Sequence, residues 1–206
     1  MKQLKILNLY AGIGGNRKLW GDEHEITAVE MNPKIAAIYQ DFFPNDKMVV
    51  GDAHQYLLDH FQEFDFIWSS PPCPTHSGFN NLNYHKGVKI KYPDMKLYEE
   101  IVLLQNWYDK KYCIENVISY YDPLIAPQKV DSHYYWANFY IRPKEKTKRG
   151  IRGEDMDFRR SKVGFNFEKF NLTKTFEKKI INNCVEPEMG LHIFNEAFKA
   201  EVQSLF

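Results

Sequence analysis

The feature that most constrains this chain is an alternation of short strand-like runs and helical patterns over its first 120 residues. The strand-like runs are at residues 4–9, 25–30, 48–50, 64–68 and 112–117. Helical patterns follow Pro33 and cover about residues 95–108, where we expect Asp94 to cap the helix. Strands that are separated by helical crossovers form a parallel sheet with helices on both faces. We therefore predict an α/β fold with a doubly wound, mostly parallel sheet.

The residues best suited to binding and catalysis lie at the carboxyl ends of the predicted strands. They are a glycine cluster after the first strand, Glu30 ending the second, Asp52 after the third, Cys73 after the fourth and Glu115 in the fifth. Ligands of doubly wound sheets bind at the carboxyl ends of the strands. We therefore predict one functional site at this edge of the sheet.

The chain beyond residue 120 has a different character. An aromatic, strand-like run at residues 134–141 is followed by a basic stretch and then by a helical pattern from Pro187 to about Leu205. The whole chain carries 27 basic and 27 acidic residues, yet residues 142–162 hold nine basic and four acidic ones. A run of this kind is usually a solvated loop, and phosphate binding is the alternative interpretation.

Composition limits the class of protein. Aromatic residues make up 16% of the chain, which is enough apolar surface for a packed core and excludes a disordered protein. The three cysteines form no close pair, so we expect neither a disulfide framework nor a metal site. No apolar run is long enough for a membrane span, and the first residues lack the apolar core of a signal peptide. We therefore expect a soluble, cytoplasmic protein.

The glycines after the first strand indicate a nucleoside cofactor. A dinucleotide-binding motif requires Gly-x-Gly-x-x-Gly, but after Gly12 and Gly14 the third position is Arg17, which argues against a dehydrogenase. A cofactor with ribose and adenine but no phosphate fits better, namely S-adenosylmethionine. Glu30 would bind the ribose hydroxyls and Asp52 the adenine amino group. Taken alone, each acid is better explained as a helix cap or a surface carboxylate, but their joint placement at successive strand ends favours cofactor binding.

Cys73 and Glu115 suggest covalent catalysis. Cys73 follows two prolines and precedes a polar loop, a setting that suits a reactive thiolate, whereas Cys113 and Cys184 are interpreted as packing residues. Glu115 lies in an apolar strand, where a charge is costly unless it is paired or functional, and Asn116 is expected to orient the loop after Cys73. A thiolate, a protonated carboxyl group and a methyl donor suit methylation of cytosine at carbon 5, through thiolate addition at carbon 6.

These motifs resemble those of the DNA cytosine-5 methyltransferases, particularly the short phage-encoded group, along almost the whole chain. The matching segments are residues 8–15, 29–33, 51–53, 70–74, 115–117 and 183–187. The resemblance implies a class I, Rossmann-like, S-adenosylmethionine-dependent enzyme that flips a cytosine out of double-stranded DNA. The catalytic residues that it implies are Cys73, Glu115, Asn116 and His133. The cofactor-binding residues are Tyr10, Ala11, Gly12, Ile13, Gly14, Gly15, Glu30, Met31, Asp52, Ala53, Pro72, Asn183 and Val185.

The chain departs from the family's pattern in three places. Pro74 stands where most bacterial members have Gln, and Asn182 replaces the glycine of the closing segment. The family's Gln-x-Arg-x-Arg motif, placed at residues 128–135, has lost its arginines, and only His133 can stand in for one of them.

We divide the chain into a catalytic domain at residues 1–141, a very small, basic target-recognition region at 142–179 and a C-terminal segment at 180–206 that completes the catalytic domain. The polar loop after Cys73 and the basic region are expected to contact DNA. The predicted DNA contacts are Ser77, Asn80, Arg142, Lys144, Lys148, Arg149, Arg152, Arg159 and Arg160.

Two other functions stay open beside a DNA cytosine-5 methyltransferase. A tRNA cytosine-5 methyltransferase shares the same motifs. A catalytically weak protein that holds the methyl donor or DNA would fit the eroded arginine motif and the small recognition region. We expect the DNA enzyme, acting as a monomer, in the host's cytoplasm if a phage encodes it.

Overall fold

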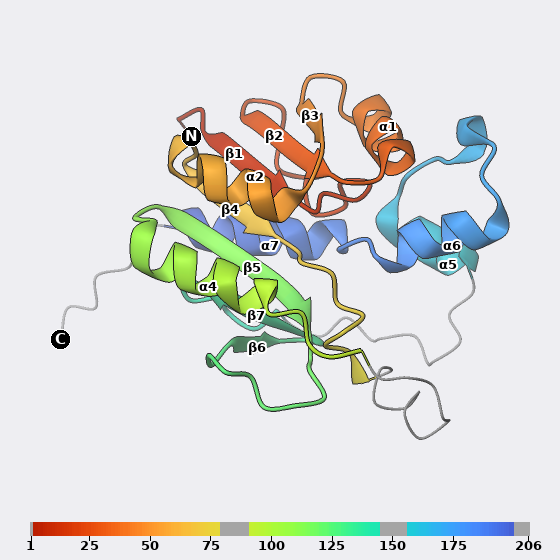
Figure 1. Ribbon diagram of the computed structural model, residues 1–206. Coiled ribbons are helices and arrows are strands. Elements are labelled where there is room, and N and C mark those ends of the chain that lie inside the picture. Colours follow the sequence, from red (N-terminus) through yellow and green to blue (C-terminus); the bar gives the residue numbers. More distant parts are fainter. Residues whose placement is uncertain (1, 79–90, 145–155, 200–206) are drawn as a thin grey trace.

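The computed structural model describes residues 2–78, 91–144 and 156–199. Its centre is a seven-stranded sheet in the order β3-β2-β1-β4-β5-β7-β6 (Figure 1). The strands are β1 (Lys5–Leu9), β2 (Glu25–Glu30), β3 (Lys47–Val50), β4 (Phe66–Ser69), β5 (Lys111–Val117), β6 (Gln128–Val130) and β7 (His133–Ala137). The first five strands are parallel, and β7 runs antiparallel to both of its neighbours. The predicted doubly wound, mostly parallel, Rossmann-like sheet is confirmed.

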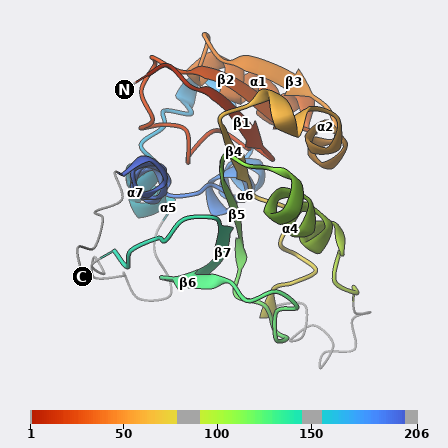
Figure 2. The same cartoon turned by 90° about the vertical axis from the view of Figure 1, so that its left-hand side faces the viewer.

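Helices cover both faces of this sheet (Figure 2). They are α1 (Pro33–Phe42), α2 (Ala53–His60), α4 (Lys96–Trp107), α5 (Met156–Val163), α6 (Lys174–Asn182) and α7 (Pro187–Phe198), with short 3₁₀ turns at Phe61–Glu63 and Glu168–Phe170. One face packs Leu7 and Ile67 against α2 and α4. The other packs Phe66 and Trp68 against Phe194 of α7. Because side chains alternate across a strand, this two-sided burial explains the nearly continuous apolar runs of β1 and β4.

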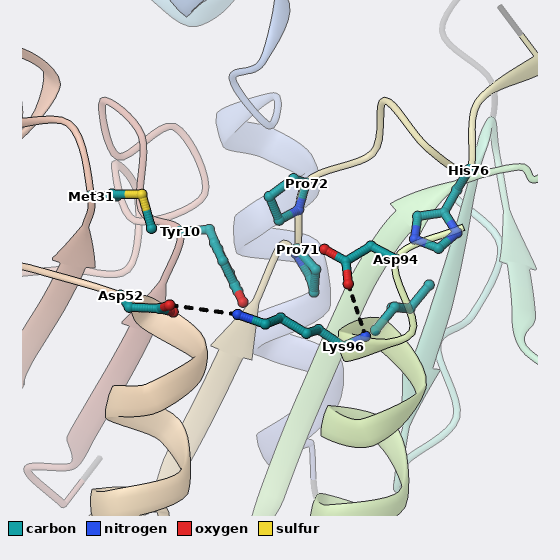
Figure 3. A pocket seen from close by; sticks show the side chains of 9 residues that line it. Tyr10, Met31, Asp52, Pro71, Pro72, His76, Asp94 and Lys96 are labelled. Carbon is teal, nitrogen blue, oxygen red and sulfur yellow. Dashed lines mark hydrogen bonds and ion pairs between the residues drawn. The ribbon is translucent and has the colours of Figure 1, made fainter. Parts of the chain in front are cut away.

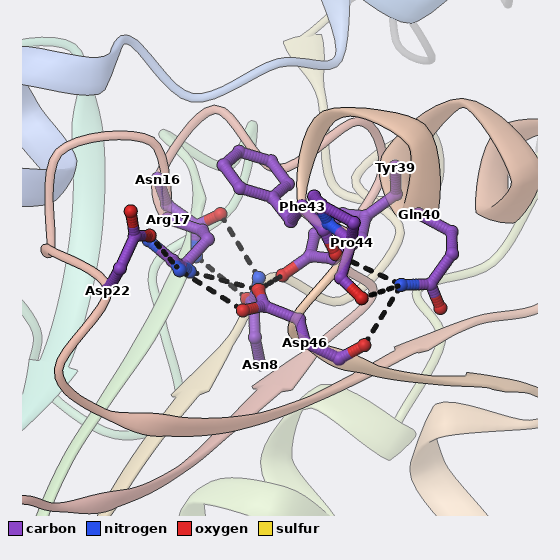
Figure 4. Close-up of polar contacts among 9 residues, drawn as sticks. All are labelled: Asn8, Asn16, Arg17, Asp22, Tyr39, Gln40, Phe43, Pro44 and Asp46. Atoms are coloured by element: carbon purple, nitrogen blue, oxygen red, sulfur yellow. Dashed lines mark hydrogen bonds and ion pairs between the residues drawn. The ribbon is translucent and has the colours of Figure 1, made fainter.

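The connection between β1 and β2 departs from the expected helical crossover, because residues 10–24 form a series of turns. A buried polar network holds these turns in place (Figure 4). Arg17 Nε and Nη2 donate to the Asp46 carboxylate over 2.9 and 3.1 Å, and the Tyr39 hydroxyl donates to the same carboxylate over 2.7 Å. The Asn16 side chain donates to Asn8 Oδ1 over 2.8 Å. These bonds satisfy the buried polar side chains of the turns and of the residues that pack against them.

The C-terminal helix is shorter than predicted. It begins at Pro187 as expected but ends at Phe198, and Lys199 has extended backbone angles. Ile193, Phe194 and Ala197 are its buried apolar residues, so its packing against the sheet ends at the same point as the helix. Residues 200–206, which include the predicted helix end, lie outside the described residues.

The described part of the basic region packs against the catalytic fold. A cluster built on Ile13 and Ile38 includes Val163 and Phe167, which lie in and after α5, and Ile180 of α6. This segment therefore covers the side of α1 next to the glycine turns. Within the described residues, no helix combines the length and apolar character of a membrane-spanning segment.

Candidate active site

A pocket of about 140 Å³ opens where the carboxyl ends of the parallel strands meet the first turns of α2 and α4 (Figure 3). The lining residues are Tyr10, Met31, Asp52, Pro71, Pro72, His76, Asp94, Lys96 and Leu97. Four of the predicted cofactor residues, Tyr10, Met31, Asp52 and Pro72, therefore line the same pocket.

Asp52 is both a helix cap and a pocket residue. Its Oδ1 accepts hydrogen bonds from the backbone N–H groups of His54 and Gln55 over 2.9 and 3.3 Å, which caps α2. Its Oδ2 lies 3.5 Å from Lys96 Nζ. Partial burial disfavours the charged form, but the two backbone hydrogen bonds and Lys96 outweigh it, so the pKa of Asp52 is lowered. Asp52 therefore presents a charged acceptor to the pocket.

Glu30 ties the glycine turn to the end of β2. Its Oε2 accepts from the backbone N–H of Gly12 over 3.1 Å, and its Oε1 accepts from that of Asn32 over 2.8 Å. Gly12 has a φ of 55°, a left-handed conformation that favours glycine. The carboxylate is thus held at the edge where a ribose would lie, although it is not among the residues that line the pocket.

The remaining residues of the glycine motif contact protein rather than the pocket. A side chain at Gly14 would overlap the rings of Tyr39 and Phe43, and one at Gly15 would overlap Cys184 and Val185. The structure therefore brings the predicted closing segment against the glycine turn, but through close packing. Ala11, Ile13 and Ala53 are buried in the core. Asn183 is exposed at the end of α6.

Cys73 lies on a turn directly after β4. Its carbonyl oxygen accepts from the backbone N–H groups of His76 and Ser77 over 3.0 Å each, and the Asn116 side-chain amide donates to the carbonyl of Pro71 over 3.0 Å. Asn116 thus holds the loop before Cys73, where we predicted the loop after it. Burial and then the charge of Glu115 raise the pKa of the Cys73 thiol. The thiol is therefore protonated at neutral pH in the free protein.

Glu115 points to the same end of the sheet from β5, the neighbour of β4. It is buried, and its Oε1 lies 3.5 Å from His133 Nε2. His133 belongs to β7, which pairs with β5 so that Val117 lies opposite His133. The structure therefore brings Glu115, Asn116 and His133 together beside the loop that carries Cys73.

Five of the nine residues that line the pocket were not among the predicted site residues: Pro71, His76, Asp94, Lys96 and Leu97. His76 is buried, its Nδ1 lies 2.5 Å from the Tyr121 hydroxyl, and its Nε2 has no hydrogen-bond partner within the described residues. A histidine three positions after Cys73 is the only signal that could have found it. Leu97 gave no signal beyond helical periodicity. Asp94 accepts from the backbone N–H of Lys96 over 3.1 Å and lines the pocket, but the N-cap of α4 is Met95, one residue after the predicted cap.

The described basic residues of the predicted DNA surface are bonded within the protein. Arg160 donates to both carboxylate oxygens of Glu177 over 2.6 and 2.9 Å. Lys144 pairs with Glu188 over 3.0 Å, Arg142 lies 3.8 Å from Glu196, and Arg159 donates to Asn182. Ser77 forms an antiparallel bridge with Ser119. Asn80, Lys148, Arg149 and Arg152 lie outside the described residues.

Comparisons with known proteins indicate the family to which the chain belongs. A family model described as C-5 cytosine-specific DNA methylase matches residues 4–121. A mouse tRNA (cytosine(38)-C(5))-methyltransferase is 29% identical over 79 residues, which are 35% of this chain and 19% of the mouse protein. The putative methyltransferase yhhF from Escherichia coli is 16% identical, with a TM-score of 0.43, over 66% of this chain and 74% of its own. An S-adenosylmethionine-dependent methyltransferase from Agrobacterium tumefaciens is 14% identical, with a TM-score of 0.41, over 58% and 40%. These two structural similarities are too low to bear on function.

The pocket suits the nucleoside part of S-adenosylmethionine. Tyr10, Pro71 and Leu97 offer apolar walls to a flat ring, and Asp52 offers an acceptor to an exocyclic amino group. The family match covers more than half of the chain and includes the glycine turn, Cys73 and Glu115. The chain therefore belongs to the C-5 cytosine-specific DNA methylase family, and its cofactor is S-adenosylmethionine.

Proposed function

We propose that the protein methylates carbon 5 of cytosine in double-stranded DNA through a covalent adduct with Cys73. The observation that supports this most is the convergence of Cys73 and Glu115 from neighbouring strands. Glu115 is close enough for its charge to raise the pKa of the Cys73 thiol, and Asn116 bonds to Pro71 in the nucleophile loop. A nucleophile and an acid at this proximity can act on one ring.

The chain's own residues divide the work of the reaction. The Cys73 thiolate adds to carbon 6 of a cytosine that has been flipped out of the duplex, while Glu115 holds a proton at ring nitrogen 3. When bound, S-adenosylmethionine supplies an electrophilic methyl group, which carbon 5 of the activated ring attacks. Water then takes the carbon 5 proton, and the electron pair of that bond restores the ring double bond and expels the Cys73 sulfur as a thiolate. His133 Nε2 lies 3.5 Å from Glu115 Oε1, which places an imidazole beside this acid.

The free enzyme holds Cys73 as a thiol, so deprotonation must accompany substrate binding. Burial is the first cause of its raised pKa, and the negative charge of Glu115 is the second. A proton on Glu115 removes that charge and therefore favours the thiolate. Protonation of Glu115 therefore favours the Cys73 thiolate and also provides the proton that Glu115 holds at ring nitrogen 3.

DNA contact in this proposal falls to the loop after Cys73 and to the basic region. Arg160 and Lys144 are also bonded to carboxylates of the protein. Lys148, Arg149 and Arg152, together with Asn80, are further predicted contacts and lie outside the described residues. In this proposal they bind phosphates, and Ser77 contributes from the nucleophile loop.

The decisive experiment is covalent trapping on DNA that contains 5-fluorocytosine, because fluorine replaces the proton whose loss releases the sulfur. We expect a stable adduct with the parent chain and with Cys184→Ser, and none with Cys73→Ser. An adduct that forms equally with Cys73→Ser would overturn the proposal.

Methylation of tRNA is the second candidate, because the mouse relative is named a tRNA methyltransferase. Labelled methyl donor, supplied with DNA or with tRNA in parallel, separates the two. Incorporation into DNA supports the proposal, and incorporation into tRNA alone replaces it. Donor binding by calorimetry without incorporation into either would instead indicate a binding protein.

A further inference from the structure

Glu100 of α4 is a fully buried carboxylate that the proposed reaction does not use. Its side chain has an exposed fraction of 0%. Burial of a carboxylate is costly unless other groups bond to it. The partners of Glu100 therefore indicate what the residue is for.

Three side chains from three other elements bond to this carboxylate. The Tyr10 hydroxyl donates to Oε1 over 2.7 Å, and the Ser69 hydroxyl donates to Oε2 over 2.6 Å. His54 Nδ1 lies 3.1 Å from Oε1, and its Nε2 lies 3.1 Å from Glu99 Oε2. Tyr10 follows β1, Ser69 ends β4 and His54 lies in the first turn of α2.

Each of these partners is next to a wall of the cofactor pocket. Tyr10 lines the pocket itself, His54 is two residues after Asp52, and Ser69 is two residues before Pro71. The helix that carries Glu100 also supplies Lys96 and Leu97 to the pocket. Figure 3 shows that the pocket walls come from these separate elements. Glu100 therefore joins three elements beside the pocket, through Tyr10, His54 and Ser69, to its own helix α4.

The backbone of Tyr10 gives an independent sign that its side chain must be held. Its φ is 54°, a left-handed conformation that is unfavourable for a bulky residue. Residues in such conformations persist where the surroundings fix them, often at binding sites. The hydroxyl bond to Glu100 is a contact that fixes this ring.

We propose that Glu100 is a positioning residue for S-adenosylmethionine. Its carboxylate sets the relative placement of Tyr10, the cap at Asp52 and the loop at Pro71 before the cofactor binds. This raises the affinity for S-adenosylmethionine, because no free energy is then spent on ordering the pocket residues when the cofactor binds. This inference rests on the cofactor of the family and is independent of the choice between DNA and tRNA.

The test is the dissociation constant of S-adenosylhomocysteine, measured by calorimetry on the full chain without nucleic acid. We expect Glu100→Gln to weaken binding at least about tenfold, since an amide nitrogen would face a hydroxyl donor. The matched control is Glu99→Gln, which changes the adjacent carboxylate, whose side chain is 59% exposed, and should alter the dissociation constant less than about twofold. Unchanged affinity in a folded Glu100→Gln protein would overturn the proposal.

A double-mutant cycle on Tyr10 and Glu100 separates positioning from general stabilisation. If Glu100 acts by positioning Tyr10, the effects of the two substitutions on the cofactor dissociation constant are coupled. Tyr10→Phe, which removes only the hydroxyl, should weaken binding in the parent chain and add little in the Glu100→Gln background. Fully additive effects would contradict the proposal. If Glu100→Gln does not fold, the cycle is run with Tyr10→Phe and Ser69→Ala, and the same criterion applies. Failure of methyl transfer to DNA would leave these binding results intact, so the two proposals fail separately.

Discussion

The side-chain amide of Asn116 donates a hydrogen bond to the carbonyl oxygen of Pro71 over 3.0 Å, which ties β5 to the loop that carries Cys73. The same side chain accepts from the backbone N–H of Val117 over 2.9 Å. Asn116 is buried, so both groups depend on this side chain rather than on water. The distance between the acid on β5 and the nucleophile after β4 is therefore set by a neighbour of the acid.

Asn116→Ala should slow adduct formation on 5-fluorocytosine DNA by about ten- to a hundredfold, because the nucleophile loop loses its anchor. It should also lower the free energy of unfolding by about 1–3 kcal/mol, the cost of an unpaired buried carbonyl. The control is Asn138→Ala, which removes bonds to Tyr112 and Lys110 at the other end of β5. That variant should lose stability but keep its adduct rate, and equal rates in both variants would contradict the anchoring role.

Alkylation of Cys73 by iodoacetamide should rise steadily with pH, because burial and Glu115 raise the thiol pKa above its ordinary value near 9 and only the thiolate reacts. Glu115→Gln removes the second cause. The pKa then falls, and alkylation at pH 8 should become about two- to fivefold faster. Mass spectrometry assigns the modified residue, and the fully buried Cys113 serves as the unreactive internal control. A slower reaction in Glu115→Gln would show that this carboxylate does not act on the thiol.

The sheet and the edge at which the pocket opens were predictable from the sequence because they depend on local patterns. Apolar runs gave the strands, and the ends of parallel strands necessarily meet at one edge. Tyr10, Met31 and Asp52, which follow the ends of β1, β2 and β3, line the pocket for that reason. The pairing of Glu115 with the Cys73 loop followed from their positions at neighbouring strand ends.

Side chains that pair over long sequence separations were not predictable. Arg160 appeared to be a free cation but bonds to Glu177, which lies on another helix. Glu100 was not singled out from the sequence, because nothing local shows that Tyr10 and Ser69 reach it. The packing of Gly15 against a segment about 170 residues away was not predicted for the same reason. These contacts depend on tertiary packing rather than on periodicity.

Gly15→Ala should destabilise the protein by about 3 kcal/mol, because a methyl group would overlap the Cys184 side chain and the Val185 carbonyl. Gly12→Ala is the matched variant, since it meets no atom within 4 Å and carries only the strain of a φ of 55°. That strain should cost about 1–2 kcal/mol. Denaturant unfolding measures both. Equal losses would show that the closing segment yields to a larger residue at position 15.

The last prediction concerns the buried pair of Arg17 and Asp46, which holds the turns between β1 and β2 in place. Both side chains are 3% exposed, and Asp46 also accepts from the Tyr39 hydroxyl. Arg17→Ala should therefore cost about 3–5 kcal/mol, because it leaves the Asp46 charge buried without its partner.

Arg142→Ala is the surface control, since that side chain is 49% exposed and 3.8 Å from Glu196, and it should cost less than about 1 kcal/mol. The double variant Arg17→Met/Asp46→Leu should be less destabilised than Arg17→Ala alone, because it leaves no unpaired charge. If the double variant loses as much unfolding free energy as Arg17→Met and Asp46→Leu lose together, the two residues stabilise the turns independently and not as an ion pair.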